Sequence, residues 1–270
     1  MNFAVVGIAG YIAQRHLEAI RDLGHTVMAG VDVHDSAGRL DWFDLNIRFS
    51  RSMALLQDLP LDYVSVCTPN YLHAEHVEVA LRYGHKVIVE KPTVTNPDSL
   101  DRFEGREVNT ISQMRIHPEV LRLRQDLDPA RRYSVQLNYC APRGMWYKYS
   151  WQSNPRFSGG LPMSIGFHMF DLLLYLFGPV DTFKVIRSSN NLYCSGRLTL
   201  ERADVEWRLT TLPQDKELGR TITIDGEAVD LSSSFTALHT EAYRQILAGN
   251  GLTIQDVRPT IKLCHQLATL

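Results

Sequence analysis

Short apolar runs alternate with helix-length amphipathic stretches over about the first 115 residues, and this alternation constrains the fold more than any other feature. The apolar runs have the length and composition of buried strands and lie at 3–6, 26–32, 63–66 and 86–89. Helical spacing occurs near 13–23, 73–83 and 97–104. Strands and helices in this order predict a parallel sheet covered by helices.

The pattern changes after residue 130. Alternating strands are predicted from Tyr133 to Tyr139, over 196–211 with a turn at Arg202-Ala203, and over 221–231 around Asp225-Gly226. A helix is predicted over 164–177, and two more near 236–248 and 255–268. We expect the C-terminal helices to cover one face of this sheet or to pack back on the first domain.

The expected fold is therefore an α/β Rossmann domain with a parallel sheet over 1–117, followed by an α+β domain over 118–270. The second domain should carry a mostly antiparallel, open-faced sheet.

The composition limits the partners and the cellular compartment that we expect for the protein. The formal net charge of -2 and a pI near 6.5 give no general attraction to nucleic acid. Four cysteines without a C-x-x-C motif, and no secretory leader, suggest a reducing cytoplasm. The longest apolar stretch, 172–177, is too short for membrane insertion.

A glycine-containing turn joins the first predicted strand to the first predicted helix. It reads Gly7-Ile8-Ala9-Gly10-Tyr11-Ile12-Ala13, so G-x-x-G-x-x-A replaces the usual G-x-G-x-x-G. Glycines let backbone N–H groups approach a pyrophosphate at a helix N-terminus, which favours a dinucleotide here. A plain tight turn explains the same residues, so both interpretations stay open.

A carboxylate closes the second predicted strand. Asp32 lies 22 positions after Gly10, where an acidic side chain accepts hydrogen bonds from ribose hydroxyls and repels a 2′-phosphate. NAD, rather than NADP, is therefore the expected cofactor. The alternative role for Asp32 is an ordinary turn or N-cap residue.

Two later strands end in polar segments, Thr68-Pro69-Asn70 and Glu90-Lys91-Pro92, at the carboxyl edge where open α/β sheets bind ligands. A lysine at the end of a buried strand loses hydration and suits acid or base chemistry, and Pro92 disfavours the α region for Lys91. Ordinary explanations exist for both segments. Thr68 and Asn70 would cap the helix that carries His73, and most lysines after strands are simply solvated.

A glycine pair introduces the most apolar predicted helix, in the pattern Gly159-Gly160-x-x-x-Ser164-x-Gly166-x-His168-x-x-Asp171. On a single helix Ser164, His168 and Asp171 share one face. His168 would then remove a hydroxyl proton, Ser164 would contact the substrate and Asp171 would orient the imidazole. The alternative is a packed helix in which a backbone carbonyl satisfies His168.

In this order, the motifs resemble the glucose–fructose oxidoreductase/inositol dehydrogenase (Gfo/Idh/MocA) family over the whole chain. Three segments resemble, more narrowly, the UDP-N-acetylglucosaminuronate 3-dehydrogenases of bacterial surface-polysaccharide (lipopolysaccharide and O-antigen) synthesis: AGYIAQRH at 9–16, PNYLH at 69–73 and RGMWYKYSW at 143–151. The resemblance implies tightly held NAD(H), an oligomerising sheet domain and oxidation of a sugar hydroxyl to a ketone.

The resemblance also implies roles for single residues. Lys91 matches the motif lysine that contacts nicotinamide and substrate, and His168 matches the acid/base histidine. For Lys91 we favour an ammonium that stabilises the developing alkoxide. Ser164 departs from the pattern, because the wider family commonly has Asp there and the sugar-uronate subgroup has Asn. The expected cofactor-binding set is Gly7, Gly10, Tyr11, Ile12, Asp32, Thr68, Pro69, Asn70, His73, Glu90, Lys91 and Gln113.

Basic and aromatic residues precede the predicted catalytic helix. Arginine forks suit a diphosphate or a carboxylate, and aromatic faces suit uracil or a sugar. An antiparallel strand with ordinary exposed cations is the equally weighted alternative. The expected substrate-binding set is Arg143, Trp146, Tyr147, Ser150, Trp151, Ser164 and His168, and no metal ligands are expected.

The leading hypothesis is an NAD-dependent enzyme that oxidises C3 of UDP-N-acetylglucosaminuronic acid. Two alternatives are an inositol or free-sugar dehydrogenase and an inactive NAD-binding regulatory protein. The expected partners are a nucleotide-sugar substrate and further copies of the chain, as a dimer or a tetramer, without nucleic acid or membrane.

Overall fold

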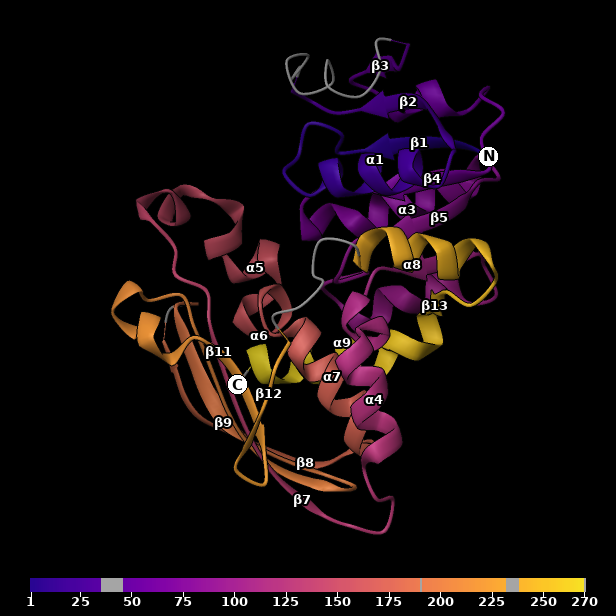
Figure 1. Ribbon diagram of the computed structural model, residues 1–270. Helices are drawn as coiled ribbons and strands as arrows, with labels where there is room; N and C mark the ends of the chain where they lie inside the picture. The colour runs from indigo at the N-terminus through magenta and orange to yellow at the C-terminus, as the bar shows by residue number, and fades with distance from the viewer. Residues whose placement is uncertain (35–45, 190, 232–237, 270) are drawn as a thin grey trace. The chain divides into compact units, whose positions relative to one another are not determined.

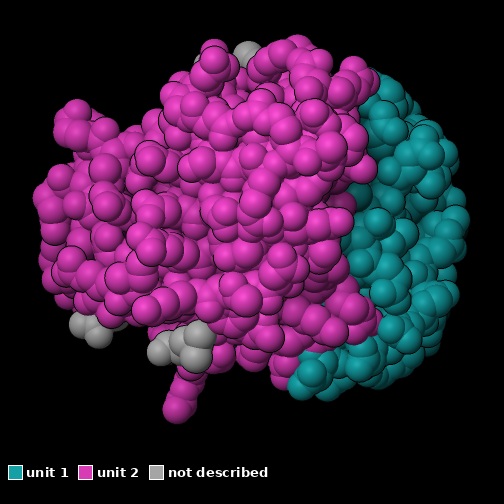
Figure 2. Space-filling model, turned by 90° about the horizontal axis from the view of Figure 1, so that it is seen from below, with its two compact units in different colours: residues 1–94, 98–112, 236–256 teal, residues 95–97, 113–235, 257–270 magenta. Residues whose placement is uncertain are grey.

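The computed structural model describes residues 1–34, 46–189, 191–231 and 238–269 (Figure 1). The chain divides into two compact units (Figure 2). Unit 1 comprises residues 1–94, 98–112 and 236–256, and unit 2 comprises residues 95–97, 113–235 and 257–270. Each unit is built around one sheet.

In the described chain, unit 1 contains a seven-stranded sheet with the order β13-β6-β5-β4-β1-β2-β3. Every neighbouring pair is parallel except β13 with β6. The four strands expected from the apolar runs are present, which confirms the parallel sheet. The bounds are β1 Asn2–Val6, β2 Thr26–Val31, β3 Arg48–Ser50, β4 Tyr63–Val66, β5 Lys86–Val89, β6 Val108–Thr110 and β13 Leu252–Thr253.

Helices cross between the parallel strands of unit 1, as the βαβ pattern predicts. α1 is Ala13–Asp22 and α3 is His73–Arg82, while the segment predicted as a helix near 97–104 is a 3-10 helix, η3, at Pro97–Phe103. Two further short 3-10 helices are η1 at Met53–Leu56 and η2 at Asn70–Leu72.

One C-terminal helix, α8 at Leu238–Leu247, lies in unit 1 and packs against α1 (Figure 1). Of the two expectations for the C-terminal helices, α8 follows the second, because it packs back on the first domain and does not cover the antiparallel sheet. The N-terminal residues of α8 include two aromatic side chains, His239 and Tyr243, that are buried in unit 1.

Unit 2 contains a six-stranded sheet with the order β12-β11-β7-β10-β9-β8. It is mostly antiparallel, as expected, with one parallel pair between β10 and β7. The Asp225-Gly226 turn is confirmed, but the turn between β9 and β10 is at Glu201-Arg202, one residue earlier than predicted. The bounds are β7 Tyr133–Cys140, β8 Val180–Ser189, β9 Tyr193–Leu200, β10 Ala203–Thr210, β11 Arg220–Ile224 and β12 Glu227–Val229.

Burial alternates along the central strands of this sheet, so one face is covered and the other is exposed. On the covered face Phe170 meets Trp207 edge to face, with ring centroids 5.4 Å apart. The helices of unit 2 are η4 Gln113–Ile116, α4 Pro118–Asp126, η5 Met145–Tyr149, η6 Trp151–Ser153, α5 Pro155–Ser158, α6 Gly160–Ser164, α7 Phe167–Phe177, η7 Pro213–Leu218 and most of α9 Ile254–Thr269.

The helix predicted over 164–177 is two helices, because α6 ends at Ser164 and α7 begins at Phe167. Gly166 lies at the break and packs closely against its surroundings. A Cβ atom at this position would lie 2.7 Å from the Leu209 side chain on β10 and 2.7 Å from the Pro162 carbonyl oxygen. The close approach to β10 therefore requires a residue without a side chain where the two helices meet.

No helix within the described ranges is long and apolar enough to span a bilayer. The four cysteines are buried and form no disulfide with one another.

We expect Gly166→Ala to lower the free energy of unfolding of unit 2 by about 1–3 kcal/mol, because the added Cβ overpacks the contact with β10. Urea denaturation followed by tryptophan fluorescence measures this. Gly144→Ala is the matched control, since its Cβ would meet only the exposed Trp146 side chain, at 3.2 Å. Equal losses in the two variants would contradict the packing argument.

Candidate cofactor and catalytic site

The turn after β1 lies against the end of β4. Gly7 has a φ of 84°, and a Cβ atom there would lie 2.8 Å from the carbonyl carbon of Cys67 and from the amide nitrogen of Thr68. Only glycine meets both conditions without displacing backbone. Gly10 follows, Tyr11 is exposed, and Ile12 is the N-cap of α1. The turn thus brings unobstructed backbone to a helix N-terminus, which is the arrangement that a pyrophosphate requires.

Asp32 lies at the end of β2, beside this turn. Its Oδ2 accepts a hydrogen bond of 2.9 Å from the amide of Ala9, and its Oδ1 accepts one of 2.9 Å from the amide of His34. The carboxylate therefore joins the glycine turn to the end of β2. This is the position from which an acidic side chain meets the ribose of a dinucleotide.

His73 connects the two polar segments that follow β4 and β5. Its Nε2 lies 2.6 Å from the carbonyl oxygen of Thr68 and its Nδ1 lies 2.6 Å from the carbonyl oxygen of Pro92. The ring is buried, so it stands behind the segments rather than at their surface. His73 therefore links these two segments, and its expected contact with the cofactor stays a prediction. Thr68 also bonds His76, through Oγ1 and Nδ1 at 3.0 Å.

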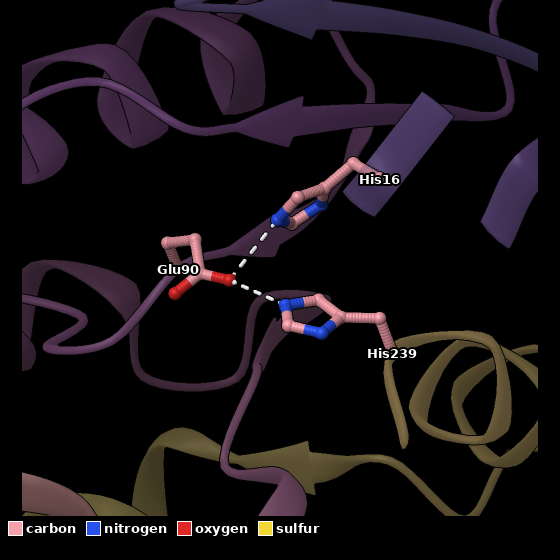
Figure 3. A group of neighbouring side chains, drawn as sticks. All are labelled: His16, Glu90 and His239. Atoms are coloured by element: carbon pink, nitrogen blue, oxygen red, sulfur yellow. Dashed lines mark hydrogen bonds and ion pairs between the residues drawn. The ribbon is translucent and has the colours of Figure 1, made fainter. Parts of the chain in front are cut away.

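The side chain of Glu90 points into unit 1 and is 8% exposed. Its Oε1 accepts hydrogen bonds of 3.1 Å from Nε2 of His16 and from Nε2 of His239 (Figure 3). Its Oε2 accepts one of 3.1 Å from the amide of Lys91. These bonds engage both carboxylate oxygens within unit 1, and the expected contact of Glu90 with the cofactor stays a prediction. Lys91 itself is half-buried at the end of the strand.

His16 and His239 stabilise the ionised form of Glu90. Burial alone would raise the pKa of Glu90, but the hydrogen bonds from His16 and His239 hold it well below its usual range. Burial lowers the pKa of His16. The hydrogen bonds from the two histidines therefore favour the ionised carboxylate, while burial favours the neutral form of the His16 imidazole.

Sequence reasoning did not identify His16, His239 or Tyr243 as site residues. Tyr243 bonds Nδ1 of His16 at 2.7 Å and Ser65 Oγ at 2.6 Å. A signal was present, because His239 and Tyr243 are four residues apart on α8 and so share one face. Which strand that face meets is not encoded in the local sequence.

In unit 2, the three residues expected to share one helical face are split between two helices. Ser164 is the last residue of α6, whereas His168 and Asp171 lie on α7. The expected spacing on one continuous helical face is therefore wrong for Ser164. Asp171 is fully buried and accepts two hydrogen bonds from Arg115, of 2.6 and 2.8 Å, and one of 2.8 Å from Thr260 Oγ1.

The basic and aromatic segment of unit 2 forms 3-10 helices, so the alternative of an antiparallel strand is wrong for these residues. Arg143 lies over the ring of Trp146, 5.7 Å from its centroid, and both Trp146 and its neighbour Tyr149 are exposed. The side chains of Tyr147 and Ser150 hold the segment together. Tyr147 is buried and donates to the carbonyl of Gln152 at 3.2 Å, and Ser150 Oγ accepts from the amide of Gln152 at 3.2 Å.

The other expected residues divide between the units. Pro69 and the buried Asn70 lie at the end of β4 in unit 1, and the buried Gln113 begins η4 in unit 2. Trp151 is partly exposed at the start of η6. Unit 1 therefore brings together the glycine turn, Asp32, Thr68 and Lys91, while unit 2 carries Ser164, His168 and the aromatic segment.

Two family models match the chain. The oxidoreductase family model described as an NAD-binding Rossmann fold covers residues 1–106, and that of the C-terminal alpha/beta domain of the same family covers residues 131–201.

The chain is 36% identical to the WlbA (WbpB) dehydrogenase of Thermus thermophilus, solved in complex with NAD and UDP-GlcNAcA. The match covers 100% of this chain and 95% of that chain, with a TM-score of 0.94. A second structure of WlbA from the same organism, in complex with NAD and alpha-ketoglutarate, matches at 35% identity with the same coverage and TM-score.

A protein of Amycolatopsis mediterranei (strain S699), named as an oxidoreductase subunit of UDP-kanosamine synthase, is 25% identical over 87% of this chain and 68% of its own length. The chain belongs to the Gfo/Idh/MocA family of oxidoreductases, and the Rossmann domain of that family binds NAD.

Proposed function

We propose that the protein uses NAD to oxidise a sugar hydroxyl to a ketone, and that the hydroxyl is at C3 of UDP-N-acetylglucosaminuronic acid. The observation that carries the proposal is the full-length match to the Thermus thermophilus WlbA dehydrogenase with NAD and UDP-GlcNAcA. Lys91 after β5 and His168 on α7 add the two groups that the reaction needs.

The residues of unit 1 fit NAD. The turn at Gly7 has no room for a side chain, and Asp32 is fixed beside it through the amide of Ala9. These residues would hold the pyrophosphate and the ribose, and the carboxylate would repel the 2′-phosphate of NADP. When bound, NAD supplies the acceptor for the hydride of the sugar carbon.

Two side chains divide the proton chemistry. His168 takes the hydroxyl proton as the carbon loses its hydride, because an imidazole titrates near neutral pH and serves as a general base. Lys91, as an ammonium, stabilises the negative charge that develops on the oxygen. The backbone of Lys91 is fixed by its hydrogen bond to Glu90 Oε2.

The basic and aromatic segment after β7 has the chemistry that an acidic nucleotide sugar requires. Arg143 and Lys148 provide positive charge for a diphosphate or a carboxylate, and the exposed ring of Trp146 provides a face for uracil or a sugar. Ser164 replaces the longer Asn or Asp side chain expected from the resemblance, so it would contact the substrate through a shorter hydroxyl.

The function is tested by NADH absorbance after mixing the purified protein with NAD and UDP-N-acetylglucosaminuronic acid, with 2-oxoglutarate in a parallel sample. The second sample is included because a WlbA structure contains alpha-ketoglutarate, which as a keto acid can accept the hydride from a tightly held NADH. NADH formation or consumption of 2-oxoglutarate supports the proposal. If neither occurs while NAD binds, the substrate assignment is wrong.

A panel of free sugars, inositol and UDP-sugars extends the same assay. Turnover restricted to UDP-sugar acids supports the nucleotide-sugar assignment, and equal turnover of free sugars favours the alternative.

We further propose that the reaction serves surface-polysaccharide synthesis in the cytoplasm. The exposed face of the unit 2 sheet supports a homo-oligomer, for which a tetramer is our proposal and light scattering is the measurement.

We expect Lys91→Met and His168→Gln each to lower kcat by about 100-fold or more while NAD still binds, because each removes one part of the proton chemistry. Stopped-flow NADH absorbance gives kcat, and calorimetry gives the Kd for NAD. Lys86→Met, at the start of β5, is the control, since this side chain is 44% exposed and pairs with Glu107 at 2.7 Å. Wild-type turnover in both site variants would refute the assignment.

We expect Asp32→Asn to reduce the preference for NAD over NADP by about tenfold or more. The amide loses the charge that repels a 2′-phosphate and weakens the bonds to the ribose, each worth about 1.5–3 kcal/mol with a charged acceptor. Calorimetric titration with both dinucleotides measures the two Kd values. An unchanged ratio would mean that Asp32 serves only the turn.

A further inference from the structure

The cluster around Glu90 joins four elements of unit 1. Glu90 follows β5, His16 is on α1 and His239 is on α8 (Figure 3). Ser65 is on β4, and Tyr243 is also on α8. All five side chains are buried. Because α8 begins about 150 residues after Glu90, the chain returns to unit 1 to complete this cluster.

The protons of this cluster can be placed by donor and acceptor chemistry. An ionised carboxylate only accepts, so Nε2 of His16 and Nε2 of His239 both carry a proton. With His16 neutral, the form that its burial favours, Nδ1 accepts from Tyr243 and Tyr243 accepts from Ser65. The hydrogen bonds therefore run in one direction, from Ser65 through Tyr243 and His16 to Glu90.

The same three side chains of His16, Glu90 and His239 could also hold a metal ion. Two observations favour hydrogen bonds. Both nitrogen to oxygen distances are 3.1 Å, within the range of N–H···O hydrogen bonds. In addition, Oε2 of Glu90 already accepts from the amide of Lys91, so the carboxylate is used from both oxygens.

We propose that His16, His239 and Tyr243 are positioning residues that act through Glu90 to fix the backbone of Lys91. The proposal rests on the proposed role of Lys91. It adds two residues of α8 to those that position this lysine. Oε1 of Glu90 is held by the two rings, and this leaves Oε2 directed at the amide of Lys91. Loss of the hydrogen bond from either imidazole lets the carboxylate of Glu90 rotate. The orientation of Lys91 then changes with it.

The test replaces His239 in two ways. His239→Leu removes the donor to Glu90, while His239→Gln places an amide N–H close to the position of Nε2. We expect His239→Leu to lower kcat by about tenfold or more with the Kd for NAD within about threefold, because small errors of orientation affect the chemical step more than binding. His239→Gln should restore kcat to within about threefold of wild type.

A second measurement needs no substrate. Hydrogen exchange of the Lys91 amide, resolved by mass spectrometry, should be faster in His239→Leu and near wild type in His239→Gln. His85→Leu is the matched control, since His85 is also a buried histidine of unit 1 and its Nε2 bonds the carbonyl of Leu56 at 2.9 Å, away from Glu90. It should leave both kcat and the exchange of Lys91 unchanged.

The outcomes separate the two proposals. If wild-type protein oxidises no sugar, the proposed function fails, and the exchange measurement still decides whether α8 holds Lys91. Unchanged exchange and kcat in His239→Leu, or equal changes in His85→Leu, overturn the positioning role. Stoichiometric zinc in purified wild-type protein that is lost from His239→Leu overturns the hydrogen-bonded arrangement.

Discussion

The buried carboxylate of Glu90 is the constraint on which the functional edge of unit 1 depends. An isolated buried carboxylate costs several kcal/mol, whereas hydrogen bonds to a charged group contribute about 1.5–3 kcal/mol each. Here His16, His239 and the amide of Lys91 supply three such bonds. Because the donors come from α1, α8 and the chain after β5, the charge is stable only when all three are in place. The segment that carries Lys91 is therefore held together with α1 and α8 as one structure.

Side chain to backbone hydrogen bonds fix the other loops at this edge. Asp32 holds the amide of Ala9, and His73 joins the carbonyls of Thr68 and Pro92. The absence of a side chain at Gly7 lets the first turn approach Thr68 directly. A cofactor that binds here meets loops that are already ordered, so little conformational entropy is lost on binding.

Local pattern was sufficient for most of the fold. Apolar runs predicted four strands of the parallel sheet, and Asp225-Gly226 predicted a hairpin turn, because these signals lie within a few residues. The strands β3, β6 and β13 have only two or three residues each, which is too short for a period to be visible. The position of α8 depends on buried contacts of His239 and Tyr243 with distant residues, which no local window contains.

In the candidate site, too, local sequence predicted some positions and distant packing set the others. Lys91, Asp32 and Thr68 follow strands, so sheet geometry alone placed them at one edge. Ser164 and His168 could not be placed relative to each other by helical spacing, because packing of Gly166 against β10 interrupts the helix between them. Their relative position is set by this corner and not by a common helix axis. A replacement at Ser164 therefore changes the reach of a side chain at the end of α6 and leaves the axis of α7, which carries His168, intact.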